Sequence, residues 1–197
     1  MRYDAEHKQK TRAKVLQVAA KAIRADGPER IGVAGVMAEA GLTHGGFYAH
    51  FRSKDELVDA AIEQMFAESS ARRQREMEGH DPADGLAAYI DFYLSKKHRD
   101  ARGTGCPIAA LSSDLPRLSE ASRAHFAAGI QNLTRAIGEK LTALGHAQAE
   151  AQARSTVAEL IGALSLARIE PVPARSDAIL ADSRRQLKQR LGLEVKA

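Results

Sequence analysis

The chain has 197 residues, of which 44% are hydrophobic, and this is typical of a soluble globular protein with one domain or two small ones. The sequence shows no apolar window long enough for a membrane span and no signal peptide, which predicts a cytoplasmic protein. The net charge of +4 suits a polyanionic partner, and the single cysteine excludes an intramolecular disulfide. Abundant Ala and Leu without an alternating β pattern predict an all-α fold of about nine helices.

The first nine residues show no hydrophobic periodicity, so we expect them to lack a stable helix. From Lys10 onward the apolar residues fall on one face, and this first helix is predicted to end at Asp26-Gly27-Pro28. Basic side chains cover the opposite face. A solvated helix surface is the simplest interpretation of most of them.

Residues 32–51, GVAGVMAEAGLTHGGFYAHF, predict two short helices joined by a turn. Apolar residues recur at helical spacing up to Ala40 and stop at Gly41, a residue type that readily adopts the left-handed conformation at a helix end. A second helix of about two turns follows, with the Thr43 hydroxyl as its cap. This is the geometry of a helix-turn-helix motif, whose second helix enters the major groove of DNA.

The second helix of the motif carries two glycines that destabilise a helix. Gly45 and Gly46 each cost roughly 0.5 to 1 kcal/mol relative to alanine. Two explanations stay open: close packing against the first helix of the motif, and close approach of the backbone to base edges. His44 is a candidate for a base contact, whereas Phe47 and Phe51 are expected to hold the core of the motif.

Ser53 begins the next helix, because residues 53–56, SKDE, fit the S-x-x-E capping box. The free backbone N–H groups at this helix start, together with Lys54, predict a site for a DNA phosphate. The helix is expected to continue to about Glu78 and to end at Gly79. It would therefore connect the helix-turn-helix unit to the rest of the chain.

Residues 10–65, with the FYAHF box, the Ser-Lys pair that follows and the turn glycine, resemble the DNA-binding domain of the TetR family of bacterial repressors. The resemblance implies that the start of the first helix and part of the helix-turn-helix motif lie against phosphate groups. The residues that it places there are Lys10, Arg12, Lys14, Tyr48 and His50. We accordingly divide the chain into a DNA-binding domain (1–52), a connecting helix (53–78) and a ligand-binding and dimerisation domain (79–197).

The second domain shows buried helical stripes but few chemical motifs. Asp81-Pro82 begins a helix that is expected to reach about Lys97, and a basic, glycine-containing loop is expected to follow. Some side chains here are candidates for the wall of a ligand pocket, although plain core packing is the simpler explanation of the aromatic ones. The candidates are Tyr89, Phe92 and Tyr93 in this helix, and His125 and Phe126 in a long helix over residues 118–144.

Cys106 precedes a proline and is predicted to be the N-cap of a short helix that extends toward Ser113. The helix dipole, with Arg99 and Arg102, would stabilise a thiolate there, which makes Cys106 a candidate sensor of oxidants or electrophiles. Some TetR-like regulators that resemble this chain carry a cysteine at the opening of the same helix. The alternative is a buried cysteine without chemistry.

Two helices close the chain, on either side of a break at residues 170–173. In the TetR family the last two helices of each subunit pair with their mates in a four-helix bundle, so the resemblance implies a homodimer. An intramolecular core would show the same apolar stripes. The interface candidates are Val157, Leu160, Ile161, Leu164, Leu180 and Leu187.

These features predict a homodimeric transcriptional regulator, most simply a repressor, which a small-molecule or electrophilic inducer releases from a near-palindromic operator in double-stranded DNA. One alternative is an enzyme with Cys106 as nucleophile and His98 or His125 as base, for which the sequence offers no orienting residue or oxyanion site. Another is an architectural DNA-binding protein without a ligand. The sequence shows no metal-ligand spacing and no cofactor motif.

Overall fold

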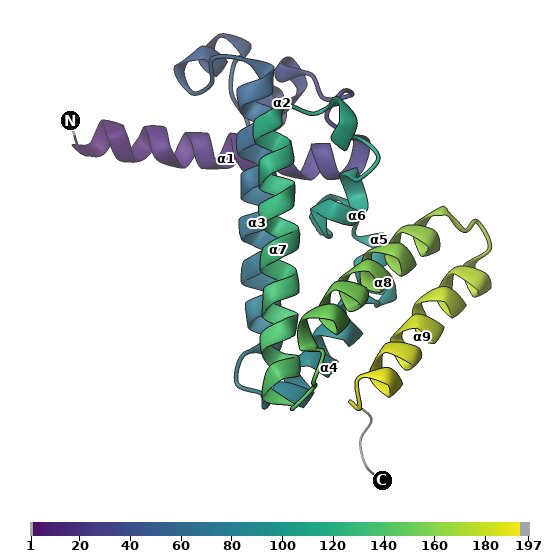
Figure 1. Cartoon of the computed structure of the whole chain (residues 1–197). Helices are drawn as coiled ribbons and strands as arrows, with labels where there is room; N and C mark the ends of the chain where they lie inside the picture. Colours follow the sequence, from purple (N-terminus) through teal and green to yellow (C-terminus); the bar gives the residue numbers. More distant parts are fainter. Residues whose placement is uncertain (1, 194–197) are drawn as a thin grey trace.

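The computed structural model describes residues 2–193, and it describes side chains from Glu6 onward. These residues form nine α-helices and three short 3-10 helices without a strand, as the composition predicts (Figure 1). The helices are α1 (Arg2–Asp26), α2 (Val33–Glu39), η1 (His44–Ala49), α3 (Lys54–Met77), α4 (Pro82–Tyr93), α5 (Lys96–Asp100), η2 (Arg102–Thr104), α6 (Pro107–Leu111), η3 (Leu115–Arg117), α7 (Glu120–Ala143), α8 (Ala149–Ile169) and α9 (Pro173–Arg190).

Figure 1 shows α3 and α7 side by side, with α1 lying across one end of this pair. The short elements α2 and η1 pack on each other beside α1 at that end. Further along, α3 packs against α4, and α8 packs against both α7 and α9. One connected apolar core runs from the N-terminal helices into the body of the molecule. None of the described helices combines the length and the apolar character that crossing a bilayer requires.

The helix α1 begins at Arg2, so the expectation of an irregular N-terminal stretch is wrong. Residues 6–10 of this helix are exposed, so the hydrophobic pattern does not reveal it. A pair between Lys10 Nζ and Glu6 Oε1, 2.9 Å apart and one helical turn apart in sequence, supports it instead. The predicted end is confirmed, because Gly27 has φ +86° directly after Asp26.

The caps predicted for α3 and α4 are confirmed. The Ser53 hydroxyl accepts a hydrogen bond from the Glu56 backbone N–H at 3.1 Å, and Gly79 has φ +74° just beyond the end of α3. At α4, Asp81 Oδ1 accepts the N–H groups of Ala83 and Asp84, each at 2.9 Å. These local hydrogen bonds fix where the connecting helix ends and where the next helix begins.

The segment from Lys96 to Gly105 is not the loop that the sequence predicts. The helix α4 ends at Tyr93, and the short helices α5 and η2 follow. The Ser95 hydroxyl caps α5 by accepting the His98 N–H at 3.1 Å. The segment is basic and contains glycine, which predicts a loop, and the cap at Ser95 is therefore missed from the sequence.

The dimer-interface prediction needs correction, because most of those side chains are buried within one chain. Leu160, Leu164 and Leu187 have no exposed surface, and Val157 and Leu180 are almost fully covered. They fill the contacts of α8 with α7 and with α9. Among the six candidates only Ile161 is half-buried. The large apolar side chains that this part of the chain leaves exposed are Leu166, Ile169 and Val172.

Candidate DNA-binding and ligand-binding sites

The helix-turn-helix motif consists of α2, a turn at Gly41 and η1. Gly41 has φ +72°, as a residue that ends a helix in the left-handed conformation does. The second helix is a six-residue 3-10 helix rather than an α-helix, and Thr43 stands at its N-cap position without a side-chain hydrogen bond. Phe47 and Phe51 are buried with their ring centroids 5.6 Å apart, so they hold the core of the motif as predicted.

The outward face of η1 is free of other parts of the chain. Tyr48 is 70% exposed, and His44 is also exposed. A Cβ added at Gly45 would meet nothing within 4 Å, and one at Gly46 would only touch Met37 and Thr43 at 3.7 Å. Packing within the chain therefore does not explain the two glycines.

The first half of α1 brings positive charge to the motif. The Arg12 guanidinium lies 4.8 Å from the centre of the Phe51 ring, and Lys14 Nζ lies 3.5 Å from where a Cβ on Gly41 would be. Burial, followed by the charges of Lys8 and Arg12, lowers the pKa of His50. Its Nδ1 is buried without a partner among the described residues. The Lys10 ammonium is exposed and pairs with Glu6.

At the start of α3, more of the hydrogen-bond donors are already paired within the chain than the sequence predicts. The Lys54 ammonium donates to the Glu29 carbonyl at 3.1 Å. The N–H of Glu56 is bonded to the Ser53 hydroxyl, and Glu56 Oε2 accepts the N–H of Arg52, the residue before the cap, at 2.8 Å, rather than that of Ser53. Lys54 keeps two further N–H donors for an anion, whereas part of the helix start is already satisfied.

A cavity of about 60 Å³ lies between α3, α4, α6 and α7. Four of the six predicted pocket residues line it: Tyr89, Phe92, Tyr93 and Cys106. His125 and Phe126 do not, because Phe126 is buried behind Phe66 with its ring edge-on at 5.0 Å. The other side chains of the wall include Phe66, Ser69, Arg72, Arg73, His98, Ile108, Asn132 and Leu133.

The arginines of this wall come from α3 and are the residues that sequence reasoning misses. Ser69 follows Phe66 by three residues, and Arg72 and Arg73 follow Ser69 by three and four, so all four share one face of a helix that the sequence does predict. The sequence gives no sign of what that face packs against. The cavity therefore follows from the packing of α3 on α4 and α7.

His98 fixes part of the cavity wall through its two ring nitrogens. Nδ1 lies 2.7 Å from the Tyr93 carbonyl oxygen, and Nε2 lies 3.0 Å from the Cys106 backbone nitrogen. Because a carbonyl only accepts and an N–H only donates, His98 is the neutral tautomer with its proton on Nδ1. Burial agrees with this, since it lowers the pKa of His98 to about 4.

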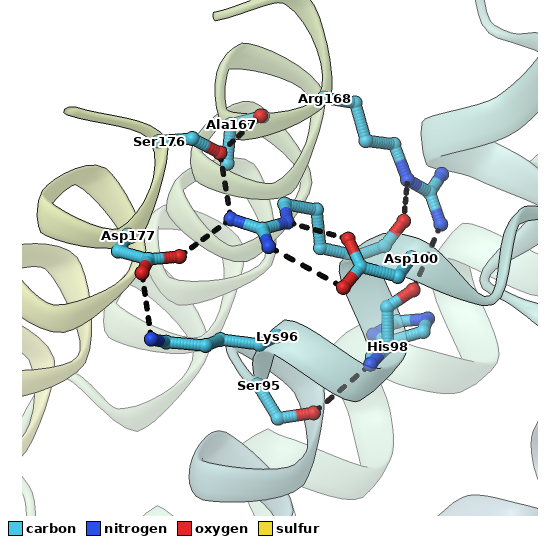
Figure 2. A network of polar contacts seen from close by, with 9 residues as sticks. Ser95, Lys96, His98, Asp100, Ala167, Arg168, Ser176 and Asp177 are labelled. Atoms are coloured by element: carbon cyan, nitrogen blue, oxygen red, sulfur yellow. Dashed lines mark hydrogen bonds and ion pairs between the residues drawn. The ribbon is translucent and has the colours of Figure 1, made fainter. Parts of the chain in front are cut away.

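Cys106 is buried at the N-cap of α6, as its proline neighbour predicts. Arg99 does not turn toward it. The Arg99 Nη1 donates instead to Ser176 Oγ at 2.8 Å and to Asp177 Oδ1 at 2.7 Å, in the network that joins α5 to α9 (Figure 2). Arg102 is exposed, and α6 has only five residues. The predicted activation of the thiol by Arg99 is therefore wrong.

The catalytic alternative also finds no support in this geometry. The lone pair on His98 Nε2 accepts the Cys106 backbone N–H, so it is not directed at the thiol as a general base would be. His125 lies outside the cavity.

Comparison with known proteins agrees with both parts of the fold. Residues 15–61 match the family described as bacterial regulatory proteins, tetR family. Residues 82–183 match the family described as transcriptional regulator LmrA/YxaF-like, C-terminal domain. The second match covers the helices that form most of the cavity wall, all of α8 and the first part of α9.

Two curated relatives and one solved structure illustrate the similarity. The chain is 34% identical over 89 residues to TtgR of Pseudomonas putida, covering 45% of this chain and 42% of that protein. It is 28% identical over 103 residues to YfiR of Bacillus subtilis, covering 52% and 50%. The matches thus span half or less of these relatives. A TetR transcriptional regulator from Chloroflexus aurantiacus has the same fold, with a TM-score of 0.82 at 24% identity over 95% of this chain and 96% of that one. With both domains matched, the chain belongs to the TetR family of DNA-binding transcriptional regulators.

Proposed function

We propose that this regulator is a homodimeric repressor that binds a near-palindromic operator through η1 and leaves it when a small molecule occupies the cavity. Two copies of η1, about one helical turn apart, would fit successive major grooves of double-stranded DNA. The observation that carries the DNA-binding part is the free face of η1, where exposed His44 and Tyr48 flank two glycines that no packing within the chain requires.

The charges near this face support the same proposal. Lys10, Arg12 and Lys14 lie on the half of α1 that approaches the motif, and Lys54 begins the helix that follows it. Together with Tyr48 and His50 they suit phosphate groups, whereas His44 suits a base edge. Gly45 and Gly46 would let the backbone approach the bases. The residues proposed for phosphate contact should set affinity, and His44 should set sequence preference.

The cavity supports the inducer part, because it combines aromatic walls with a few polar groups, as small-molecule sites do. Binding there would shift the protein toward a conformation with lower operator affinity, by as much as the ligand prefers that conformation. One observation supports a reactive inducer: Cys106 lines the cavity. Its buried thiol, without Arg99 beside it, favours a non-covalent ligand.

The test uses a duplex that the wild-type protein selects from random sequence, and single-base variants of that duplex. We expect Lys54→Ala and Tyr48→Phe to weaken binding to all variants by a similar factor, because a phosphate contact carries no sequence information. His44→Ala should change which base is preferred at one position of each half-site. An unchanged preference profile in His44→Ala would contradict the assignment of His44 to a base.

A further inference from the structure

The cavity is positively charged and lacks a counter-charge. Arg72 and Arg73 both line it, and no Asp or Glu is among the described residues that do. Arg73 donates to the Ser70 hydroxyl at 3.0 Å, and the Arg72 guanidinium lies 5.6 Å from the centre of the Phe92 ring. Neither guanidinium forms an ion pair within the described part of the chain. In a half-buried site, two unpaired positive charges favour an anion over a neutral ligand of the same shape.

The cavity also holds an unsatisfied hydrogen-bond donor. Tyr93 is 2% exposed, and its hydroxyl makes no hydrogen bond of ordinary geometry within the described residues. The Cys106 thiol beside it offers only a weak sulfur acceptor. Burial, followed by the neighbouring Cys106 and Tyr89, raises the pKa of Tyr93 well above its ordinary value, so the hydroxyl stays protonated. A buried donor without a partner is costly, and a ligand oxygen would remove that cost.

The remaining wall and the volume limit the apolar part of the ligand. Phe66, Phe92 and Leu133 offer aromatic and aliphatic surface. The cavity measures about 60 Å³, whereas an engineered cavity of about 150 Å³ is known to hold benzene. The apolar part should therefore be smaller than an aromatic ring, which suits a chain of a few carbon atoms.

We propose that the cavity binds a short-chain carboxylate, with the carboxylate among Tyr93, Arg72 and Arg73 and the hydrocarbon tail against the aromatic wall. This names the ligand class for the inducer site and rests on the proposed function in that respect only. The binding itself can be measured without DNA.

The test compares butyrate with butyramide, which has the same size and shape but no charge, by isothermal titration calorimetry on the full chain at matched ionic strength. We expect the wild type to bind butyrate about ten-fold more tightly than butyramide. Arg72→Gln and Arg73→Gln should each reduce this preference, and Tyr93→Phe should weaken butyrate binding. Arg75→Gln is the matched control, because Arg75 lies on the same helix but does not line the cavity.

The single cysteine reports where the ligand binds. Because Cys106 lines the cavity, butyrate should slow its alkylation by iodoacetamide, and butyramide should do so much less. Equal affinity for the two compounds, no binding of either at tens of millimolar, or an unchanged preference in both arginine variants would overturn the proposal. Loss of the proposed function is separate: it would appear as failure of the protein to select any DNA duplex, whatever the butyrate result.

Discussion

His98 connects two backbone groups that border the cavity, and this role makes stability depend on pH. In the folded chain its pKa is lowered from 6.5 to about 4 by burial, so the unfolded state binds more protons between these values. A histidine whose folded pKa is lowered stabilises the fold at neutral pH, and that stability is lost as the pH falls from about 6.5 to about 4. The free energy of unfolding at pH 4 is then lower than at pH 7 by up to about 3 kcal/mol from this group alone.

We therefore expect the free energy of unfolding, measured by urea denaturation, to fall over this pH range in the wild type. His98→Gln should be less stable at pH 7 and should show a smaller fall, because glutamine does not titrate. An equally steep fall in His98→Gln would show that other groups cause the pH dependence. His50, whose pKa is also lowered, is the group to substitute next in that case.

Gly129 is needed because the Phe66 ring lies directly over it. A Cβ at this position would be 2.1 Å from the nearest atom of that ring. Gly129→Ala should displace Phe66 and destabilise the chain by about 1 to 3 kcal/mol, despite the better helix propensity of alanine. Thermal denaturation checks this, with Gly162→Ala as control, since a Cβ added there meets nothing within 4 Å. A Gly129→Ala variant as stable as the wild type would contradict the packing described.

The segment from α5 to α6 is held from two sides by arginines. Arg168 of α8 donates to the carbonyls of His98 and Arg99, each at 3.2 Å (Figure 2). Arg24 of α1 donates to Gly103 O at 3.4 Å, to Met65 O at 3.2 Å and to Glu68 at 2.7 Å. The same segment lines the cavity through His98 and Cys106, so it touches the DNA-binding unit, the cavity and the last two helices.

The Arg24 side chain is 2% exposed, so its removal should be costly. We expect Arg24→Gln to lower the free energy of unfolding by about 2 to 4 kcal/mol and to speed amide hydrogen exchange in η2. Arg154→Gln is the control, because Arg154 forms an exposed pair with Glu150 that is worth at most about 0.5 kcal/mol. Unaltered exchange at Thr104 and Gly105 in Arg24→Gln would mean that α1 does not hold this segment.

The sequence predicts an element well when neighbouring residues determine it, and poorly when residues far apart in the chain determine it. The ends of α3 and α4 depend on caps at Ser53 and Asp81, and the turn of the motif depends on Gly41, so each is visible in a few neighbouring letters. The position of Arg99 depends on Asp177, which lies 78 residues away. Cavity residues such as Arg72 are likewise defined by packing between distant helices, which periodicity does not reveal.

Apolar periodicity shows that one face of a helix is buried, but it does not show whether the same subunit or a second copy buries it. The stripes of α8 and α9 are covered within the subunit, and the side chains that remain exposed are Leu166 (58%), Ile169 (75%) and Val172 (39%). Three such residues at the end of one helix and the following turn suit an interface between two copies. The dimer prediction thus moves to the exposed end of α8 and the turn that follows it.

We expect Ile169→Asp to produce a folded monomer, because the charge replaces an exposed apolar contact. Leu164→Asp should instead unfold the subunit, since it would bury an unpaired charge in the core. Sedimentation velocity and circular dichroism separate these outcomes. A stable Ile169→Asp dimer at micromolar concentration would place the interface elsewhere.

Whether the protein recognises an operator as a dimer is tested by selecting DNA with it from a random duplex library and measuring the mass of the resulting complex. We expect a two-fold symmetric sequence whose half-sites are about 10 base pairs apart, centre to centre, and which is bound by an even number of subunits. Selection of no sequence, or of one without symmetry by a single subunit, would contradict the claim that this chain regulates transcription as a dimer through η1.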